Sequence, residues 1–574
     1  MLNSRIHVLI AVFFIAIFIS GTCIAVIINS DFGKLEVKSI HIEDADKQLT
    51  GIMYIPSEAS TENPSPAIIL AHGISESKEV MTNLGLEIAR KSFVVLCLDL
   101  IGHGNSGGTV SEGTNETDFG VSAATRYLQT QPYVNSSAIG LVGHSLGGGA
   151  VRAEAAKNKN ILSTVLVAGG LGLETQNPNY AALNATFPKN LLVIVGKYDV
   201  LFNITDLETK ELPTAFNTSG TIMPDITYGN FQQYTARKLI VPSTTHIFEP
   251  VDPKTVMETV NWLENSLRTN HIPQAESKIN LLYPQRETVL LIALIGLIGI
   301  TLTSYYPITK AFSRKNKDIS CTDNKPNAQW RTLAVWAILN LILFFPLISI
   351  GFVISFPPLI FGSSMAWWLI VTGLIGILLF AKNKPKLWKT KPELKKTILQ
   401  NFSRNDIVIA IFLFAIIFTI SSLLQGLYTI NLRILAPIFQ QLTQPRRILA
   451  FAAFMPFFLI YFIAEGLYLH IPQLVKPDLK RKAKAGEWAK VVFAKISPFV
   501  ILIAIQYLPQ LFLNIQVLPS FVGFIAEFLW LIVPVFIITT TFSWWLYNQT
   551  GTIGTAAVLN GLVFAWIASV TFPF

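Results

Sequence analysis

The 574-residue chain has only three cysteines, Cys23, Cys97 and Cys321, and they lie far apart in the sequence. Such isolated thiols support neither a disulfide framework nor a metal site built on cysteine pairs. Charged residues are also scarce, at 14% of the chain, whereas hydrophobic residues make up 51%. This balance is too apolar for a purely soluble protein and indicates several membrane-spanning segments.

The net charge of +9 is concentrated in three segments between apolar runs, at 305–331, 382–406 and 471–490. Together they hold 20 Lys and Arg residues against six acidic residues, so the rest of the chain is slightly acidic. Basic residues confined to such loops are a signal of membrane topology. We therefore expect membrane lipids, and no nucleic acid, among the partners of this protein.

Apolar runs long enough for membrane helices occur at both ends of the chain. The first, at 7–28, exceeds the ~7–15 apolar residues of a signal peptide and lacks a small-x-small cleavage site, which favours an uncleaved anchor. Eight more runs bring the expected total to about nine spans: 287–304, 332–356, 359–381, 407–428, 448–470, 490–513, 521–546 and 552–572.

Threading these spans alternately through a membrane puts all three basic loops on one side, which the positive-inside rule makes cytoplasmic. The opposite side receives the segment 429–447, re-entrant or interfacial, with only three arginines. We therefore predict a cytoplasmic N-terminus in a cell-membrane protein with three domains. These are an anchor at 1–30, an extracytoplasmic globular domain at 31–286 and a multi-pass domain of about eight helices at 287–574.

Strand-like and helix-like segments alternate in the globular domain. Buried strands are expected at 66–72, 92–99, 138–144, 161–169 and 190–196, and helices at 78–90, 118–130, 145–157 and 253–267. This alternation predicts a mostly parallel sheet covered by helices.

The sequence Gly143-His144-Ser145-Leu146-Gly147 falls between a predicted strand and a predicted helix. A serine at such a turn is held in a strained conformation that exposes its hydroxyl above the sheet. Small glycines, here Gly143 and Gly147, are needed on both sides of it. We therefore predict that Ser145 is a nucleophile, although a structural turn is the plain alternative.

A serine nucleophile needs a histidine as general base and a carboxylate to orient that histidine. Only His246, His271 and His470 follow Ser145, the order expected for this arrangement. His470 lies in a predicted span and His271 in the stretch that leads back to the membrane. His246, between a strand-like segment and the helix at 253–267, is the predicted base.

The predicted acid is Asp199, three residues after Gly196 at the end of a strand, with Asp206 and Asp225 as alternatives. Two backbone N–H groups should hold the oxyanion. We assign them to Leu146, which follows the nucleophile, and to Ile74, which follows the His72-Gly73 turn.

These motifs resemble the α/β-hydrolase superfamily. The branch with serine aminopeptidases and monoacylglycerol lipases, and the related dienelactone-hydrolase-like group, are similar in five stretches: "AHG" (71–73), "DLIGHGNSGG" (99–108), "GHSLGGG" (143–149), "GKYD" (196–199) and "TTH" (244–246). The resemblance covers about 45–268. Dienelactone hydrolases use cysteine as nucleophile, so serine at 145 does not imply their activity.

Two features outside these motifs are candidates for a function. The insertion between Asp199 and His246 has room for a small substrate lid. In the membrane domain, Glu465 and Glu527 are ionisable residues within predicted spans, which makes each a functional hypothesis against the plainer role of linking helices.

The leading hypothesis is a membrane-embedded serine hydrolase that cleaves ester or amide bonds of small-molecule, lipid-derived or peptide substrates. It needs no cofactor and no metal. The alternatives are a transporter with an accessory hydrolase domain, and a scaffold with a vestigial one. The sequence leaves the bond type and the oligomeric state open.

Overall fold

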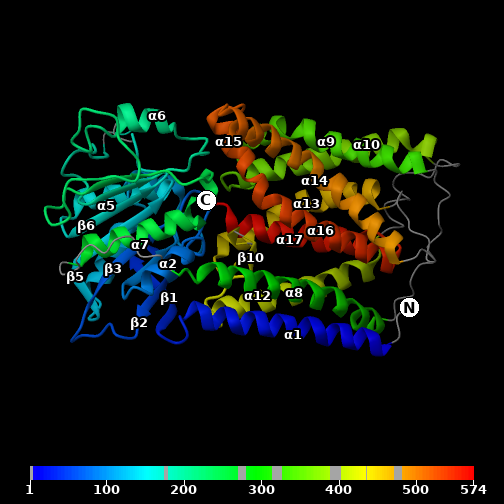
Figure 1. Cartoon of the computed structure of the whole chain (residues 1–574). Helices are drawn as coiled ribbons and strands as arrows, with labels where there is room; N and C mark the ends of the chain where they lie inside the picture. The colour runs from blue at the N-terminus through cyan, green and yellow to red at the C-terminus, as the bar shows by residue number, and fades with distance from the viewer. Residues whose placement is uncertain are drawn as a thin grey trace.

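The computed structural model describes residues 4–172, 177, 179–268, 280–312, 326–387, 402–434, 436–437, 439–470 and 481–574. Cys321, His271 and most of the three basic segments lie outside these residues. The chain forms a globular part, built around a sheet, and a helical bundle attached to one end of it (Figure 1). The beginning of α1 (Ser4–Asn29) lies at the end of the bundle away from the globular part.

Nine strands form one sheet in the order β1-β2-β4-β3-β5-β6-β7-β9-β8. The strands from β4 to β9 in this order run parallel, whereas β1, β2 and β8 are antiparallel to their neighbours. Their bounds are β1 Leu35–Asp44, β2 Lys47–Pro56, β3 Ser65–Ala71, β4 Val94–Leu98, β5 Val134–His144, β6 Ile161–Val167, β7 Leu191–Ile194, β8 Thr227–Tyr228 and β9 Arg237–Ile240.

Helices cover both faces of this sheet, which explains why its central strands are apolar on both sides. Leu128 of α4 (Val121–Gln129) and Val151 of α5 (Leu146–Lys157) belong to the buried cluster on one face. Leu84 of α2 (Thr82–Ala89) and Leu263 of α7 (Pro253–Leu267) belong to the cluster on the other. The predicted mostly parallel sheet is confirmed, and the hairpin β1–β2 that extends it was not predicted.

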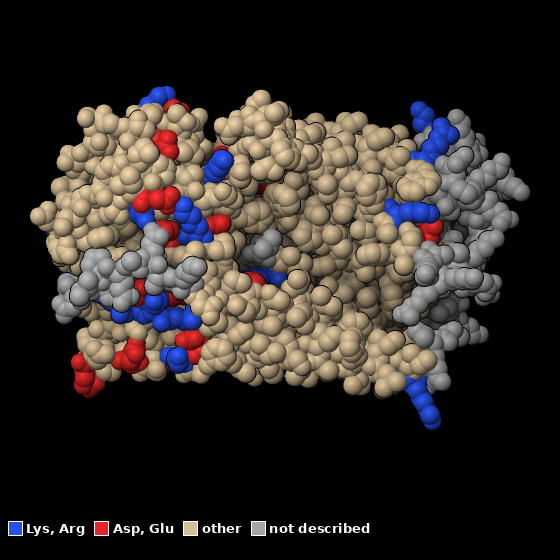
Figure 2. All heavy atoms as spheres, in the orientation of Figure 1, with Lys and Arg blue, Asp and Glu red and all other residues tan. Residues whose placement is uncertain are grey.

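Among the described residues, nine helices are long and apolar enough to cross a membrane. They are α1 Ser4–Asn29, α8 Tyr283–Ala311, α9 Pro326–Val353, α10 Gly362–Leu387, α12 Arg404–Tyr428, α13 Pro445–Leu469, α14 Arg481–Leu513, the pair α15 Ser520–Glu527 and α16 Leu529–Thr550, and α17 Gly554–Thr571. On the face shown in Figure 2, most of the bundle surface between its two ends carries no charged residue. The expected helical bundle is therefore confirmed, and the chain has the character of a multi-pass membrane protein.

Polar contacts fasten the bundle to the globular part. Arg286 at the start of α8 donates to Asn29 Oδ1 at 2.6 Å, and its guanidinium also contacts Asn83. Arg433 donates to Glu287 Oε2 at 2.9 Å and to the carbonyl oxygen of Glu79 at 2.5 Å. Arg433 lies in the segment 429–447, so this segment docks onto the globular part. Both arginines are buried, so the contact between the bundle and the globular part is closed to solvent at these positions.

Candidate active site

The turn between β5 and α5 places Ser145 where the sequence predicts a nucleophile. Ser145 has φ 50° and ψ −115°, a conformation that residues other than glycine rarely adopt. A Cβ on Gly143 would lie 2.2 Å from the Gly147 carbonyl oxygen, and one on Gly147 would lie 2.3 Å from that of Ala71. Only glycine fits at 143 and 147, so the close packing on both sides holds the serine in its strained conformation.

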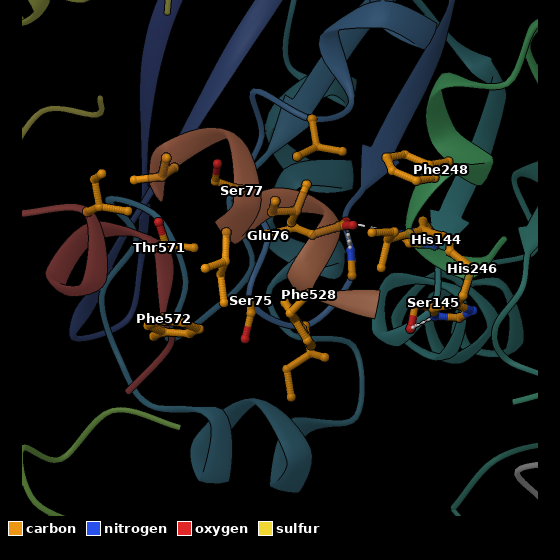
Figure 3. Close-up of a pocket in the computed structure, with 18 of the residues that line it drawn as sticks. Ser75, Glu76, Ser77, His144, Ser145, His246, Phe248, Phe528, Thr571 and Phe572 are labelled. Carbon is orange, nitrogen blue, oxygen red and sulfur yellow. Dashed lines mark hydrogen bonds and ion pairs between the residues drawn. The ribbon is translucent and has the colours of Figure 1, made fainter. Parts of the chain in front are cut away.

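Ser145, His246 and Asp199 form one chain of hydrogen bonds, although they are far apart in the sequence. Ser145 Oγ lies 3.0 Å from His246 Nε2, and His246 Nδ1 lies 2.8 Å from Asp199 Oδ2 (Figure 3 shows the first contact). The other Asp199 oxygen accepts the Leu201 N–H at 2.7 Å. His246 and Asp199 are 1% and 3% exposed, so water does not compete for these bonds. This is the geometry of a nucleophile, a general base and its orienting acid.

The alternative acids and the alternative histidine do not lie at this site. Asp206 pairs with Lys210 at 2.5 Å and Asp225 with Lys254 at 2.9 Å, both at the surface. His470 is buried at the end of α13 in the bundle.

Both expected oxyanion donors lie next to Ser145. Leu146 is the first residue of α5, so no carbonyl within the helix is placed to accept its N–H. Ile74 lines the same cavity as Ser145, and a Cβ on Gly73 would lie 3.1 Å from Ser145 Cβ. The backbone at 73–74 therefore runs directly against the nucleophile. The roles of these two N–H groups stay predictions.

A buried ion pair supports this loop. Glu76 accepts the Gly73 N–H at 2.6 Å and lies 3.1 Å from His144 Nδ1, and His144 Nε2 lies 3.1 Å from the His246 carbonyl oxygen. Burial opposes charge on both side chains, but their mutual attraction prevails, so the pKa of Glu76 is lowered and the pKa of His144 is raised. Through these two contacts His144 links the loop at 73–76 to the loop that carries His246.

Glu249 is a second buried carboxyl that the sequence analysis missed. Its Oε1 accepts the Gly196 N–H at 2.5 Å, and its Oε2 lies 4.0 Å from His246 Nδ1. Burial, and then the nearby Asp199, raise the pKa of Glu249 well above its ordinary value. Its position three residues after His246, on the same 3-10 turn at His246–Val251, was the only signal in the sequence.

Among the described residues, one trio of metal-ligating side chains is compact enough for an ion: His144, His246 and Glu249, with ligand atoms within 4.8 Å of one another. The ring nitrogens of both histidines already face hydrogen-bond partners: Glu76 and a carbonyl for His144, Asp199 and Ser145 for His246. This donor set fits a hydrogen-bond network better than a metal centre.

The raised pKa of Glu249 has a consequence for stability. The folded protein prefers the neutral carboxyl, whereas the unfolded chain ionises above its ordinary pKa of 4.5, so stability falls as the pH rises from there towards the folded pKa. Each pH unit costs at most about 1.4 kcal/mol. We expect Glu249→Gln, which keeps the oxygen facing Gly196, to unfold several degrees higher than the parent at pH 8 and at nearly the same temperature at pH 5.

Thermal unfolding in detergent, followed by tryptophan fluorescence, measures this difference. Glu58→Gln, at an exposed position, serves as the control and should give no pH-dependent difference. Equal shifts for Glu249→Gln at both pH values would contradict a neutral Glu249.

The bundle itself forms part of the site. The Phe524 ring of α15 lies 5.6 Å from the His246 ring, edge to face. Glu527, at the end of α15, accepts the Ile247 N–H at 3.2 Å, and Tyr507 of α14 donates its hydroxyl to the other Glu527 oxygen at 2.5 Å. Glu527 therefore connects the bundle to the loop that carries His246, and we expect it to position that loop.

Removing this side chain should loosen that loop. We expect Glu527→Ala to lower kcat for ester hydrolysis about 10- to 100-fold, the effect of about 1–3 kcal/mol for unmade buried hydrogen bonds. Glu527→Gln should restore most of the activity because its amide oxygen still accepts the Ile247 N–H. Steady-state kinetics and the pH profile of kcat/KM measure both variants, with Glu487→Ala, at the other end of the bundle, as control. Equal losses in Glu527→Ala and Glu527→Gln would contradict this role.

Glu465, the other acidic residue within a predicted span, has different surroundings. Glu465 of α13 pairs with Lys495 of α14, whose ammonium also lies 2.5 Å from the Tyr461 hydroxyl. All three are buried inside the bundle and none lines the cavity at Ser145. This ion pair links two helices, and Lys495 was not predicted as the partner of Glu465.

A cavity at Ser145 extends from the sheet into the bundle. It holds about 1210 Å³ of space not filled by atoms, open solvent included. Figure 3 shows Ser145 and His246 at one side of it and Thr571 and Phe572 at the other. No residue of the insertion 200–245 lines it. The expected lid is thus replaced by helices of the membrane domain, such as α15 and α16.

The comparison with protein families agrees with this fold. Residues 66–197 match the family described as the alpha/beta hydrolase fold. Similar solved structures include the Pyrococcus furiosus esterase Pf2001, with 18% identity, TM-score 0.32 and coverage of 42% of this chain and 96% of that one. A predicted CIB-like hydrolase from Thermoplasma acidophilum is 17% identical, with TM-score 0.30 and coverage of 40% of this chain and 99% of that one. A dienelactone hydrolase from Anabaena variabilis is 18% identical, with TM-score 0.27 and coverage of 41% of this chain and 100% of that one. No curated protein matches the chain.

The family match, the mostly parallel sheet and the strained turn at Ser145 define the class of protein. The globular part has the α/β-hydrolase fold. The protein as a whole combines a domain of this fold with a bundle of membrane-type helices.

Proposed function

We propose that this protein is a membrane-embedded serine hydrolase that cleaves ester or amide bonds through an acyl-enzyme. The unbroken hydrogen-bond chain from Asp199 through His246 to Ser145 supports this proposal most strongly. A buried base within 3.0 Å of a strained serine hydroxyl is what nucleophilic catalysis requires.

In the proposed reaction, His246 Nε2 takes the proton of Ser145 as Oγ attacks the substrate carbonyl. The N–H groups of Leu146 and Ile74 hold the negative oxygen, and one such donor is worth about 2.7–4 kcal/mol. Asp199 keeps His246 in the right tautomer and stabilises its charged form. His246 then gives its proton to the leaving group, and water releases the acyl group in the reverse sequence.

We further propose that the reaction takes place at the outer face of the cell membrane. The basic loops of the sequence and the beginning of α1 are expected in the cytoplasm. The beginning of α1 lies at the end of the bundle opposite the globular part, which supports an extracytoplasmic active site (Figure 1).

The test is covalent labelling of the purified full-length protein with a fluorophosphonate, followed by mass spectrometry of its peptides. We expect a single modified serine, Ser145, because only this hydroxyl has a histidine placed to activate it in the described site. Labelling at another serine, or no labelling together with inertness towards acyl esters, would favour a scaffold with a vestigial hydrolase fold.

A further inference from the structure

The two walls of the cavity at Ser145 differ in polarity. The globular part contributes polar groups, including Ser75, Glu76 and Ser77. The bundle contributes mostly apolar side chains, with no charged one among them, as in Phe528, Leu531, Ile532, Val535, Phe564 and Ile567. An occupant that matches these walls has a polar end at the sheet and an apolar end within the bundle.

The apolar wall also reaches deep into the bundle. α16 leads away from the globular part, and Val535 follows Phe528 by seven residues, which is roughly 10 Å along a helix. α17 returns towards it, and Phe564 precedes Phe572 by eight residues, or roughly 12 Å. The cavity therefore continues for about two helical turns beyond the residues nearest the sheet.

The reaction proposed above decides which part of a substrate needs this space. After the leaving group departs, the acyl group stays bonded to Ser145 Oγ and must be housed while water attacks. The cavity that adjoins Ser145 is lined by residues of α10, α16 and α17, including Met365, and these helices are of the membrane-spanning type. Long alkyl chains are the apolar groups that a bilayer supplies at this depth.

Given the proposed hydrolase activity, we propose that the substrate is an amphiphilic ester or amide with one long acyl chain. The chain inserts between α16 and α17, and Val535 and Phe564 set its length. Ser145 Oγ bonds to the chain's carbonyl carbon as the bond to the alcohol or amine breaks. The proton of Ser145 passes through His246 to that leaving group, and water then yields the free fatty acid.

The experiment compares p-nitrophenyl butyrate, laurate and palmitate as substrates of the full-length protein in one detergent. Val535→Phe fills the far end of the cavity and should lower the laurate-to-butyrate ratio of kcat/KM about 10-fold or more, the effect of about two methylene groups that lose their contacts. Phe564→Ala opens the same end and should raise the palmitate-to-laurate ratio. Val500→Phe is the matched control, on the exposed side of α14 with 46% of its surface accessible, and should change neither ratio.

The outcomes separate this inference from the proposed function. Ser145-dependent butyrate hydrolysis with unchanged ratios in both variants overturns the acyl-chain site and leaves the hydrolase standing. Ester hydrolysis that survives Ser145→Ala, or the absence of hydrolysis of all three esters by the parent protein, overturns both. If Val535→Phe fails to fold, Phe564→Ala alone decides, and an unchanged palmitate-to-laurate ratio in it overturns the inference.

Discussion

Replacement of Ser145 with alanine should lower kcat for ester hydrolysis by about five to six orders of magnitude, as removal of a triad nucleophile does in serine hydrolases. The variant loses the only hydroxyl held 3.0 Å from His246 Nε2 in this site, and no acyl-enzyme can form. What remains is the small rate due to the oxyanion donors and to substrate positioning. Binding of substrate should change little, because the lining of the cavity is untouched.

The measurement is hydrolysis of p-nitrophenyl butyrate by purified protein, with intact fold checked by thermal unfolding. Ser136→Ala, at an exposed position near the start of β5, is the matched control and should keep full activity. If Ser145→Ala retained more than a few per cent of the parental rate, the nucleophile would have to be another group and the proposed mechanism would fail.

Replacement of Asp199 with asparagine should lower kcat by about four orders of magnitude, with a smaller change in KM. The carboxylate accepts from His246 Nδ1 at 2.8 Å, which leaves Nε2 free to accept the proton of Ser145. An amide at this position can donate to Nδ1, which favours the imidazole tautomer with its proton on Nε2. In that tautomer, Nε2 cannot accept the proton of Ser145. Because the site is buried, water does not restore the lost interaction.

The rival acids provide the controls for this variant. Asp206→Asn and Asp225→Asn, at the surface and paired with lysines, should leave kcat within about twofold. A loss of less than tenfold in Asp199→Asn would contradict its role as orienting acid. Glu249, with Oε2 at 4.0 Å from His246 Nδ1, would then be the carboxyl to replace next.

A site residue could be predicted from the sequence when its signal depends on nearby residues. The turn at Ser145 could be predicted because the glycines at 143 and 147 report contacts with backbone only a few residues away or on the adjacent strand. Asp199 and His246 could be predicted because each follows a strand of the parallel sheet. Glu76 and Glu249 were missed, since the sequence gives no sign at Glu76, and only its position after His246 at Glu249, that folding will bury the carboxyl near a histidine.

The membrane domain shows the same division. Its helices were predicted to within several residues, because length and hydropathy alone decide whether a helix suits a bilayer. The break between α15 and α16, which brings Phe524 and Glu527 to His246, was predicted as part of one continuous span.

By itself, the sequence determined the α/β-hydrolase fold, the strained serine turn, the residues expected to form the triad and the apolar helices that the described residues form. Each of these depends on residue order, local sterics or hydrophobic length. Only the tertiary structure decided that the membrane bundle, and not the insertion after Asp199, closes the cavity at Ser145. The reason is physical: a cavity wall is a property of side chains from distant segments packed together, and their distances are fixed only when the whole chain has folded.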